Sequence, residues 1–220
     1  MIFDATRTTT ADFPRIAPEL VTRARALPTA TLHEAGGKIG FLPSAIGPIT
    51  QGLAMAGPAL TVQSPGGDNL WLHRALEVAR PGDVMIVHTG GAFDFGYWGE
   101  IMSTAARACG LAGLVIDGCV RDGALLTGVG VPVFARGLSI RGTGKDFGAT
   151  GWIGAPLLMG TVVVQPGDLI VGDADGVVCL PRTQAEQVLD ASVAREAAEQ
   201  GQIQRLEAGE TTMEIFGFHR

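Results

Sequence analysis

The same three residues occur twice in this chain, each time directly before a run of aliphatic residues. Pro-Gly-Asp at residues 81–83 precedes residues 84–87, and the same tripeptide at residues 166–168 precedes residues 169–171. Pro followed by Gly is the pair that a type II turn prefers, and an apolar run released by such a turn is typical of a buried strand. The chain must therefore build a core around two such strands.

Helical and strand patterns alternate around these two strands. One helix is expected to begin at Pro18, and four more are expected at residues 31–35, 69–79, 98–109 and 183–208. Strands are expected at residues 114–116 and within residues 52–63 and 132–181. No linker or repeat divides the 220 residues, so we expect a single α/β domain. The last helix carries only a narrow apolar stripe of Val188, Leu189 and Val193, which is typical of a helix at an edge or against a neighbouring subunit.

Composition and charge exclude several classes of protein. The net charge is −6 and Lys and Arg are not clustered, so a nucleic-acid surface is not expected, because neutralising phosphates needs clustered cations. No apolar run approaches the roughly 20 residues of a membrane span. The three cysteines lack C-x-x-C spacing, which indicates neither a disulfide framework nor a zinc site. We expect a cytoplasmic protein that binds neither nucleic acid nor a membrane.

The segment most informative about chemistry is the helix start at Gly99 and Glu100, taken together with Arg121 and Asp122. Both positions are expected next to the ends of parallel-type strands, where α/β folds bind ligands. The backbone N–H groups of residues 99–102 would have no intrahelical partner, and the helix dipole adds partial positive charge there. A substrate carboxylate therefore suits this position.

Two interpretations of Arg121 and Asp122 follow from the residues alone. In the first, Arg121 clamps an anionic substrate and Asp122 is a hard oxygen ligand for Mg²⁺, which often sits on one or two carboxylates and keeps its waters. In the second, the two form a surface ion pair and Asp122 caps the next helix. Glu100 is equally ambiguous, because an acid in a first helical turn stabilises the dipole in any case. The histidine at 73 fits helix packing better than a ligand role, although it could line the pocket.

Six segments, taken in order, resemble the RraA-like family, and most of all its 4-hydroxy-4-methyl-2-oxoglutarate / 4-carboxy-4-hydroxy-2-oxoadipate aldolase branch. They are TLHEAGGKIGFL (31–42), GDNLWLHRAL (67–76), PGDVMIVHTGG (81–91), GYWGE (96–100), GLAGLVIDGCVRD (110–122) and PGDLIVGDADGVVCLPR (166–182). The resemblance covers roughly residues 18–199, and the ordered set is far more specific than any one segment. It implies a swivelling β/β/α domain that forms homotrimers or homohexamers, with the active site between subunits.

The resemblance also implies roles for particular residues. It implies that the pyruvate carboxylate binds to the loop and first helical turn formed by Gly99, Glu100, Ile101 and Met102. Arg121 would contact substrate, Asp122 would coordinate Mg²⁺ or Mn²⁺, and Glu100 would orient a metal-bound water. One departure from the family pattern is Leu125, since many members carry an acid at that position.

Two further acids complete the set that the resemblance implies. Glu34 matches an acid that holds a proton-relaying water, and Glu199 matches an acid donated by the adjacent subunit, a role for which Glu196 is a rival. The expected reaction removes the C4 hydroxyl proton of a 4-hydroxy-2-oxo acid, breaks the C3–C4 bond and leaves a pyruvate enolate. Oxaloacetate decarboxylation would give the same enolate. A Schiff base is less suited, because Lys38 and Lys145 lie in polar, Gly-rich surroundings that would not depress their pKa.

A different class of function also fits the resemblance. The family includes regulators that bind and inhibit a ribonuclease without catalysis. Those relatives generally lack the aspartate after the arginine, so the presence of Asp122 and Glu100 favours the enzyme. The sequence therefore predicts a metal-dependent carbon–carbon lyase acting on small 2-oxo acids, with the ribonuclease regulator as the alternative.

Overall fold

The strands predicted after the two Pro-Gly-Asp turns, β3 (Val84–His88) and β11 (Leu169–Asp173), lie in one sheet of the computed structural model, which describes residues 9–219. The helices are α1 (Pro18–Ala24), α2 (Thr29–Ala35), α3 (Leu70–Val78), α4 (Glu100–Ala108), α5 (Gly123–Val129), α6 (Ala185–Glu207) and α7 (Thr212–Phe216). The other strands are β1 (Gly47–Pro48), β2 (Met55–Gln63), β4 (Gly113–Asp117), β5 (Cys119–Val120), β6 (Val133–Ala135), β7 (Gly137–Leu138), β8 (Trp152–Ile153), β9 (Leu157–Met159), β10 (Val162–Val164) and β12 (Gly176–Leu180).

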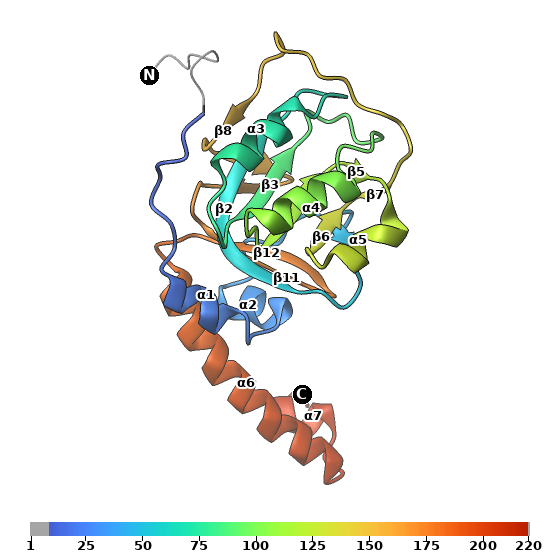
Figure 1. Cartoon of the computed structure of the whole chain (residues 1–220). Coiled ribbons are helices and arrows are strands. Elements are labelled where there is room, and N and C mark those ends of the chain that lie inside the picture. Colours follow the sequence, from blue (N-terminus) through green and yellow to red (C-terminus); the bar gives the residue numbers. More distant parts are fainter. Residues whose placement is uncertain (1–8, 220) are drawn as a thin grey trace.

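The sheet is mixed and curls toward a barrel. Its order is β1-β6-β4-β3-β2-β11-β12, with β8 beside β2, and β1 also lies against β12. Strands β2, β3, β4 and β6 are parallel, whereas β11 and β12 pair antiparallel with their neighbours. Figure 1 shows α3 and α4 over one side of this sheet and α1, α2 and α6 packed near β11. The structure confirms the α/β class and the single domain.

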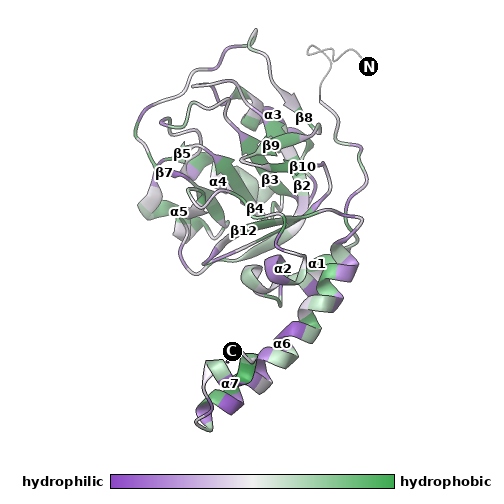
Figure 2. Cartoon of the chain, turned by 180° about the vertical axis from the view of Figure 1, so that it is seen from behind, coloured by the Kyte–Doolittle hydropathy of each residue, from purple (hydrophilic) through white to green (hydrophobic). Residues whose placement is uncertain are grey.

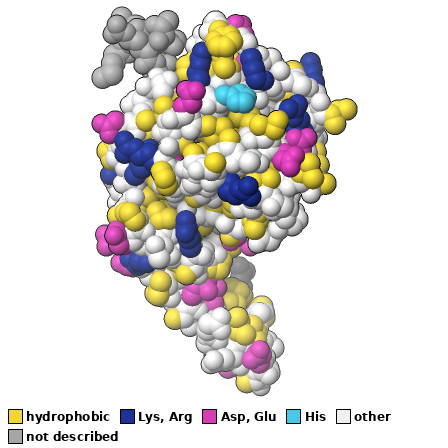
Figure 3. Space-filling model, viewed as in Figure 1, with side chains coloured by type: hydrophobic (Ala, Val, Ile, Leu, Met, Phe, Trp, Pro, Cys, Tyr) yellow, Lys and Arg dark blue, Asp and Glu magenta, His cyan; other side chains and the backbone are white. Residues whose placement is uncertain are grey.

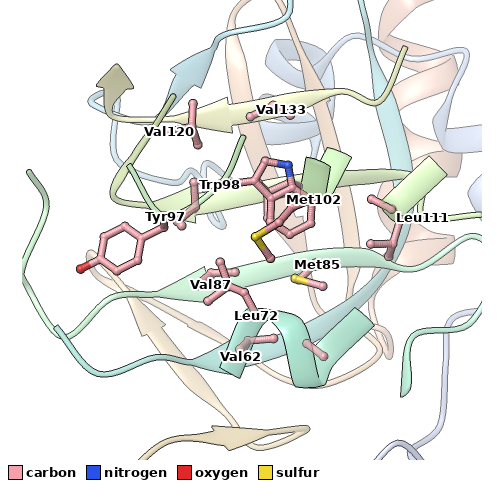
Figure 4. Close-up of a cluster of buried hydrophobic side chains, with 14 of the residues drawn as sticks. Val62, Leu72, Met85, Val87, Tyr97, Trp98, Met102, Leu111, Val120 and Val133 are labelled. Carbon is pink, nitrogen blue, oxygen red and sulfur yellow. The ribbon is translucent and has the colours of Figure 1, made fainter. Parts of the chain in front are cut away.

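The central strands β2, β3, β4 and β11 are buried on both faces along almost their whole length, as the apolar runs after the two Pro-Gly-Asp turns predicted for β3 and β11. In β3, Met85 and Val87 belong to the core under α3 and α4 (Figure 4), whereas Val84 and Ile86 belong to the core inside the curled sheet. A third core joins α1, α2 and the start of α6 to β11 and β12. Because α3 and α4 pack on the parallel strands, the start of α4 is held in a fixed position next to the ends of these strands.

Each Pro-Gly-Asp tripeptide forms the same turn. Gly82 has φ +90° and Gly167 has φ +82°, the conformation that a type II turn requires of its third residue. In both turns the aspartate carboxylate accepts a hydrogen bond from the backbone N–H three residues earlier, at 2.9 Å. The aspartate thereby satisfies a donor of its own turn, which explains in physical terms why the tripeptide recurs before buried strands.

Asp83 supports a stability prediction. Its side chain is fully buried and is held by the Arg15 guanidinium, with Nε to Oδ1 at 2.7 Å and Nη2 to Oδ2 at 3.0 Å. Asp83→Ala is expected to cost about 3 kcal/mol of unfolding free energy, because it leaves a mostly buried cation without its partner. Urea unfolding measures this. Asp12→Ala, which removes an exposed carboxylate 3.7 Å from Arg80, should change stability by less than about 0.5 kcal/mol, and equal effects of the two substitutions would contradict the interpretation.

Helix α6 leaves the body of the protein along its second half. In the predicted apolar stripe, Val188 and Leu189 are buried against the body, whereas Val193 is 54% exposed. Beyond it the helix projects away and α7 packs near its end (Figures 1 and 2). None of the helices described between residues 9 and 219 combines the length and apolar character needed to cross a membrane.

Candidate active site

A pocket of about 240 Å³ lies where α3 and α4 meet the turn that follows β5. Its walls are formed by Asn69, His73, Tyr97, Gly99, Ile101, Met102, Arg121, Asp122 and Lys145. Five of these residues were predicted as site residues from the sequence. The structure therefore brings together the start of α4 and the Arg-Asp pair, as expected for the edge where parallel strands end.

The Asp122 side chain caps helix α4 and not α5, the helix that follows it in the sequence. Its backbone is left-handed (φ 60°, ψ 31°), and its side chain makes no cap hydrogen bond to α5. Instead, the backbone N–H of Glu100 donates to Asp122 Oδ2 at 3.0 Å, and Arg121 Nε lies 3.9 Å from the same oxygen. The capping alternative for the next helix is therefore wrong, although the ion pair between Arg121 and Asp122 is present. The Glu100 N–H has no intrahelical partner, as expected, but it is already bound by Asp122. The carboxylate caps the start of α4 from outside.

Gly99 is required by space rather than by backbone conformation. Its φ of −153° is open to any residue. A Cβ built at Gly99 would lie 2.3 Å from Asp122 Oδ2 and 3.1 Å from Arg121 Cγ. The backbone N–H of Arg121 donates to the carbonyl of Trp98 at 2.8 Å, which fixes the two segments at this distance. Only glycine lets the Arg-Asp pair approach the helix start so closely.

The pocket offers complementary groups to an anion and to a hard cation. The N–H groups of Ile101 and Met102 have no acceptor among the described residues, and the Arg121 side chain is half exposed beside them. Asp122 Oδ1 carries no hydrogen bond within the described part of the chain. The same part contains no group of three His, Cys, Asp or Glu side chains arranged around a metal. A donor set of one carboxylate fits hydrated Mg²⁺ or Mn²⁺ better than zinc, which takes three or four protein ligands.

Glu100 lies beside the pocket rather than in its wall. Its side chain is exposed at the first position of α4, and its backbone N–H is the group that binds Asp122. The predicted role in orienting a metal-bound water stays a prediction.

Four residues of the pocket wall were not among the predicted site residues, namely Asn69, His73, Tyr97 and Lys145, although His73 had been considered as a residue that could line the pocket. Asn69 and His73 are separated by four positions at the start of α3, so helical spacing could have placed them on one face. The Asn69 amide donates to the Tyr97 carbonyl at 2.8 Å, while its buried Oδ1 meets no donor among the described residues. Burial, followed by the positive charge of Lys145, lowers the pKa of His73, and Asp68 opposes that effect.

The other predicted acids lie on the interface between α2 and α6. Arg195 is 3.9 Å from Glu34 and 2.7 Å from Glu199, and the Thr31 hydroxyl donates to Glu196 at 2.5 Å. None of the three glutamates lines the pocket, and α2 and α6 lie away from α4 and α5 in Figure 1. A single chain therefore does not bring Glu34, Glu196 or Glu199 to Arg121.

The rim of the pocket is apolar and open. Arg121 and Asp122 also border a second hollow of about 560 Å³, whose far side is formed by Leu138, Ser139 and Ile140. Leu138 is 61% exposed, Ile140 98% and Ile101 82%. Figure 3 shows hydrophobic side chains spread over this side of the molecule between separate Lys and Arg side chains. Such a rim is suited to a partner surface.

Comparisons with known proteins show which family the chain resembles. The RraA-like family model, described as Aldolase/RraA, matches residues 4–179. A Halalkalibacterium halodurans protein, provisionally named 4-hydroxy-4-methyl-2-oxoglutarate aldolase, is 36% identical over 179 residues, which are 81% of this chain and 84% of that protein. An uncharacterised Pseudomonas syringae structure has a TM-score of 0.81 at 28% identity, covering 94% of this chain and 97% of its own. Streptomyces coelicolor RraAS2, described as an unusual member of the RNase ES inhibitor RraA family, has a TM-score of 0.74 at 29% identity, covering 87% and 100%.

Proposed function

This chain belongs to the RraA-like family, and we propose that it is a divalent-metal-dependent lyase that cleaves 4-hydroxy-2-oxo acids to pyruvate and a second oxo acid. Substrates such as 4-hydroxy-4-methyl-2-oxoglutarate or 4-carboxy-4-hydroxy-2-oxoadipate fit this class. The observation that carries the proposal is the close approach of Arg121 and Asp122 to the start of α4, with Gly99 leaving room for both. The name of the Halalkalibacterium relative supports an enzyme of the aldolase type.

Different residues of the pocket wall would bind different groups of the substrate. The free N–H groups of Ile101 and Met102 would receive the carboxylate of the pyruvate half, where the helix dipole favours negative charge. Arg121 would donate to the 2-oxo oxygen or the same carboxylate, and its fixed charge stabilises the enolate oxygen as the bond breaks. The Arg121 interaction with the 2-oxo oxygen strengthens as negative charge develops there, which is the condition for accelerating the reaction, whereas the N–H groups of Ile101 and Met102 position the substrate.

Asp122 would hold the cation, Mg²⁺ or Mn²⁺, through the carboxylate oxygen that is not engaged by Glu100. When bound, the cation supplies a Lewis acid that polarises the 2-oxo group. The hydrogen bond from the Glu100 N–H keeps the Asp122 carboxylate in one orientation. Oxaloacetate would lose CO₂ at the same site, because that reaction passes through the same pyruvate enolate.

As described, the pocket wall of one chain holds no acid besides Asp122 that could serve as the base for the C4 hydroxyl. We assign it to Glu34 and Glu199 of a neighbouring subunit, with Glu196 as the rival of Glu199, because one chain keeps these acids on the α2–α6 interface. The exposed rim of Leu138, Ile140 and Ile101 supports a subunit contact at the pocket. The projecting half of α6 would reach a neighbour in such a homotrimer or homohexamer.

Chelation tests the proposed function. Pyruvate release from a 4-hydroxy-2-oxo acid is expected to slow in excess EDTA and to recover when Mg²⁺ or Mn²⁺ is restored, because Asp122 is the only protein carboxylate in the pocket wall as described. A coupled pyruvate assay over a panel of 4-hydroxy-2-oxo acids and oxaloacetate measures this. Unchanged turnover in EDTA would rule the metal route out.

The second candidate function is a ribonuclease regulator. The likeness to RraAS2 and to the RNA-processing inhibitor RraA of Thermus favours it, since the latter superposes with a TM-score of 0.64 at 27% identity over 70% of this chain. The carboxylate of Asp122 at the pocket favours the lyase instead. Capture of an RNA-degrading enzyme by the full chain, with no pyruvate released from any acid of the panel, would reverse this ranking.

A further inference from the structure

Arg195 contacts two acids that lie on different helices. Its Nε lies 2.7 Å from an oxygen of Glu199, one turn further along α6, and its Nη2 lies 3.9 Å from an oxygen of Glu34 on α2. Lys38 also lies 3.8 Å from Glu34, but its side chain is 70% exposed and pairs with no other carboxylate between residues 9 and 219. Within that range, Arg195 is therefore the only cation that contacts both acids.

Glu196 lies on the same helix but points elsewhere. Residues 195 and 199 are four positions apart and share a face of α6, whereas residue 196 is rotated by roughly 100° from residue 195. The Glu196 carboxylate accepts a hydrogen bond from the Thr31 hydroxyl at 2.5 Å and pairs with no cation among the described residues. Its contact joins α6 to α2 without Arg195.

Stability alone does not account for the contacts of Arg195. Leu32 of α2 and Leu189 of α6 are buried in the core that joins the two helices, so their packing does not depend on charge. The side chain of Arg195 is 41% exposed, and those of its two acids are 39% and 38% exposed. Ion pairs this open to water contribute little to stability. The cluster is, however, accessible to a neighbouring subunit, where its acids can act in chemistry.

We propose that Arg195 is a positioning residue of the lyase, which holds Glu34 and Glu199 as one unit for the pocket of the neighbouring subunit and leaves Glu196 outside that unit. The inference rests on the lyase function proposed above and on its assignment of the base to these acids. The guanidinium holds one carboxylate at Nε and the other near Nη2, and its charge offsets the repulsion between them.

The chemistry needs only one proton from the C4 hydroxyl. One of the two acids takes that proton, and the O–H electron pair forms the carbonyl of the second oxo acid. The electron pair of the C3–C4 bond becomes the enolate, which then gains a proton at C3. Arg195 touches no reacting atom in this scheme and acts only through the two carboxylates.

The test compares two reactions of one pocket. Cleavage of 4-hydroxy-4-methyl-2-oxoglutarate needs a base for the C4 hydroxyl, whereas oxaloacetate loses CO₂ without one. Arg195→Met is expected to lower kcat for cleavage about 10- to 100-fold with KM nearly unchanged, because a displaced base slows the chemical step. Decarboxylation should stay within about threefold of wild type. Arg195→Lys should restore part of the cleavage, since an ammonium can still hold one of the two acids.

Arg23→Met is the matched control for Arg195→Met. Arg23 pairs with Asp190 of the same helix at 2.5 Å, and its side chain is 39% exposed, so the variant removes an equally open ion pair from α6. Both reactions should be unchanged in it. Glu199→Gln should reproduce the selective loss of cleavage. A selective loss in Glu196→Gln instead would contradict the division between the two acids.

The remaining outcomes separate this inference from the function on which it rests. Light scattering should show the same assembly for wild type and Arg195→Met, and a selective loss that came with a smaller assembly would make Arg195 a subunit contact and overturn its positioning role. An equal fall of both reactions, or no fall in either, would also overturn it while leaving the lyase function standing. Wild-type protein that released pyruvate from neither acid would overturn both.

Discussion

Replacing Asp122 with Asn is expected to lower kcat/KM for pyruvate release about 10²- to 10³-fold while the protein keeps its fold. The amide removes the negative charge that a divalent cation needs but keeps an oxygen for the N–H of Glu100, which Asp122 Oδ2 accepts at 3.0 Å. Asn also tolerates the left-handed backbone of this position, where φ is 60°. The loss should therefore appear in turnover and in Mg²⁺ affinity, with the melting temperature nearly unchanged.

Asp122→Ala separates the chemical role from the structural one. Alanine removes the same charge and in addition the cap on α4, and it meets the left-handed conformation without a polar side chain. We expect a similar loss of activity together with about 1–2 kcal/mol lower stability. A thermal or urea unfolding series of wild type, Asn and Ala variants measures the difference. If the Asn variant kept wild-type turnover and Mg²⁺ dependence, Asp122 could not be the ligand.

The sequence was most informative where local chemistry and burial act together. The Pro-Gly-Asp turns predicted β3 and β11 because a turn residue with positive φ and an apolar run are both local signals. The helices at residues 70–78 and 185–207 likewise followed from periodicity. The two-residue strands β1 and β5 were missed, since such short strands depend on their partners rather than on their own residues. Helix α5 entered only through the capping alternative for Asp122.

The site was only partly accessible to sequence reasoning. Spacing left Arg121 and Asp122 between an ion pair and a metal site, and the resemblance favoured the second. That Asp122 caps α4 depends on two segments 22 positions apart meeting in space, which no local pattern encodes. Lys145 enters from a loop without periodicity, so only the folded chain reveals it as a pocket residue. For the acids of α2 and α6, the resemblance assigned roles at the active site, but a single chain does not bring these acids to the pocket.

Gly99→Ala is expected to reduce kcat/KM about 10²-fold, although neither the new methyl group nor the residue it replaces takes part in chemistry. The added Cβ would lie 2.3 Å from Asp122 Oδ2 and 3.1 Å from Arg121 Cγ, so both functional side chains must move to admit it. Backbone strain is not involved, because φ at Gly99 is −153°. A displacement of about 1 Å is enough for a loss of this size when the site acts by positioning.

Gly128→Ala is the matched control for this prediction. Gly128 lies within α5, and nothing stands within 4 Å of a Cβ built there. Alanine at Gly128 should therefore leave turnover unchanged and raise stability by up to about 1 kcal/mol, because glycine is a poor helix former. Steady-state kinetics and unfolding curves of the two variants measure both effects. If Gly99→Ala retained wild-type kcat/KM, the close packing of Arg121 and Asp122 on the start of α4 would not matter for catalysis. That result would contradict the lyase proposal, which depends on this geometry.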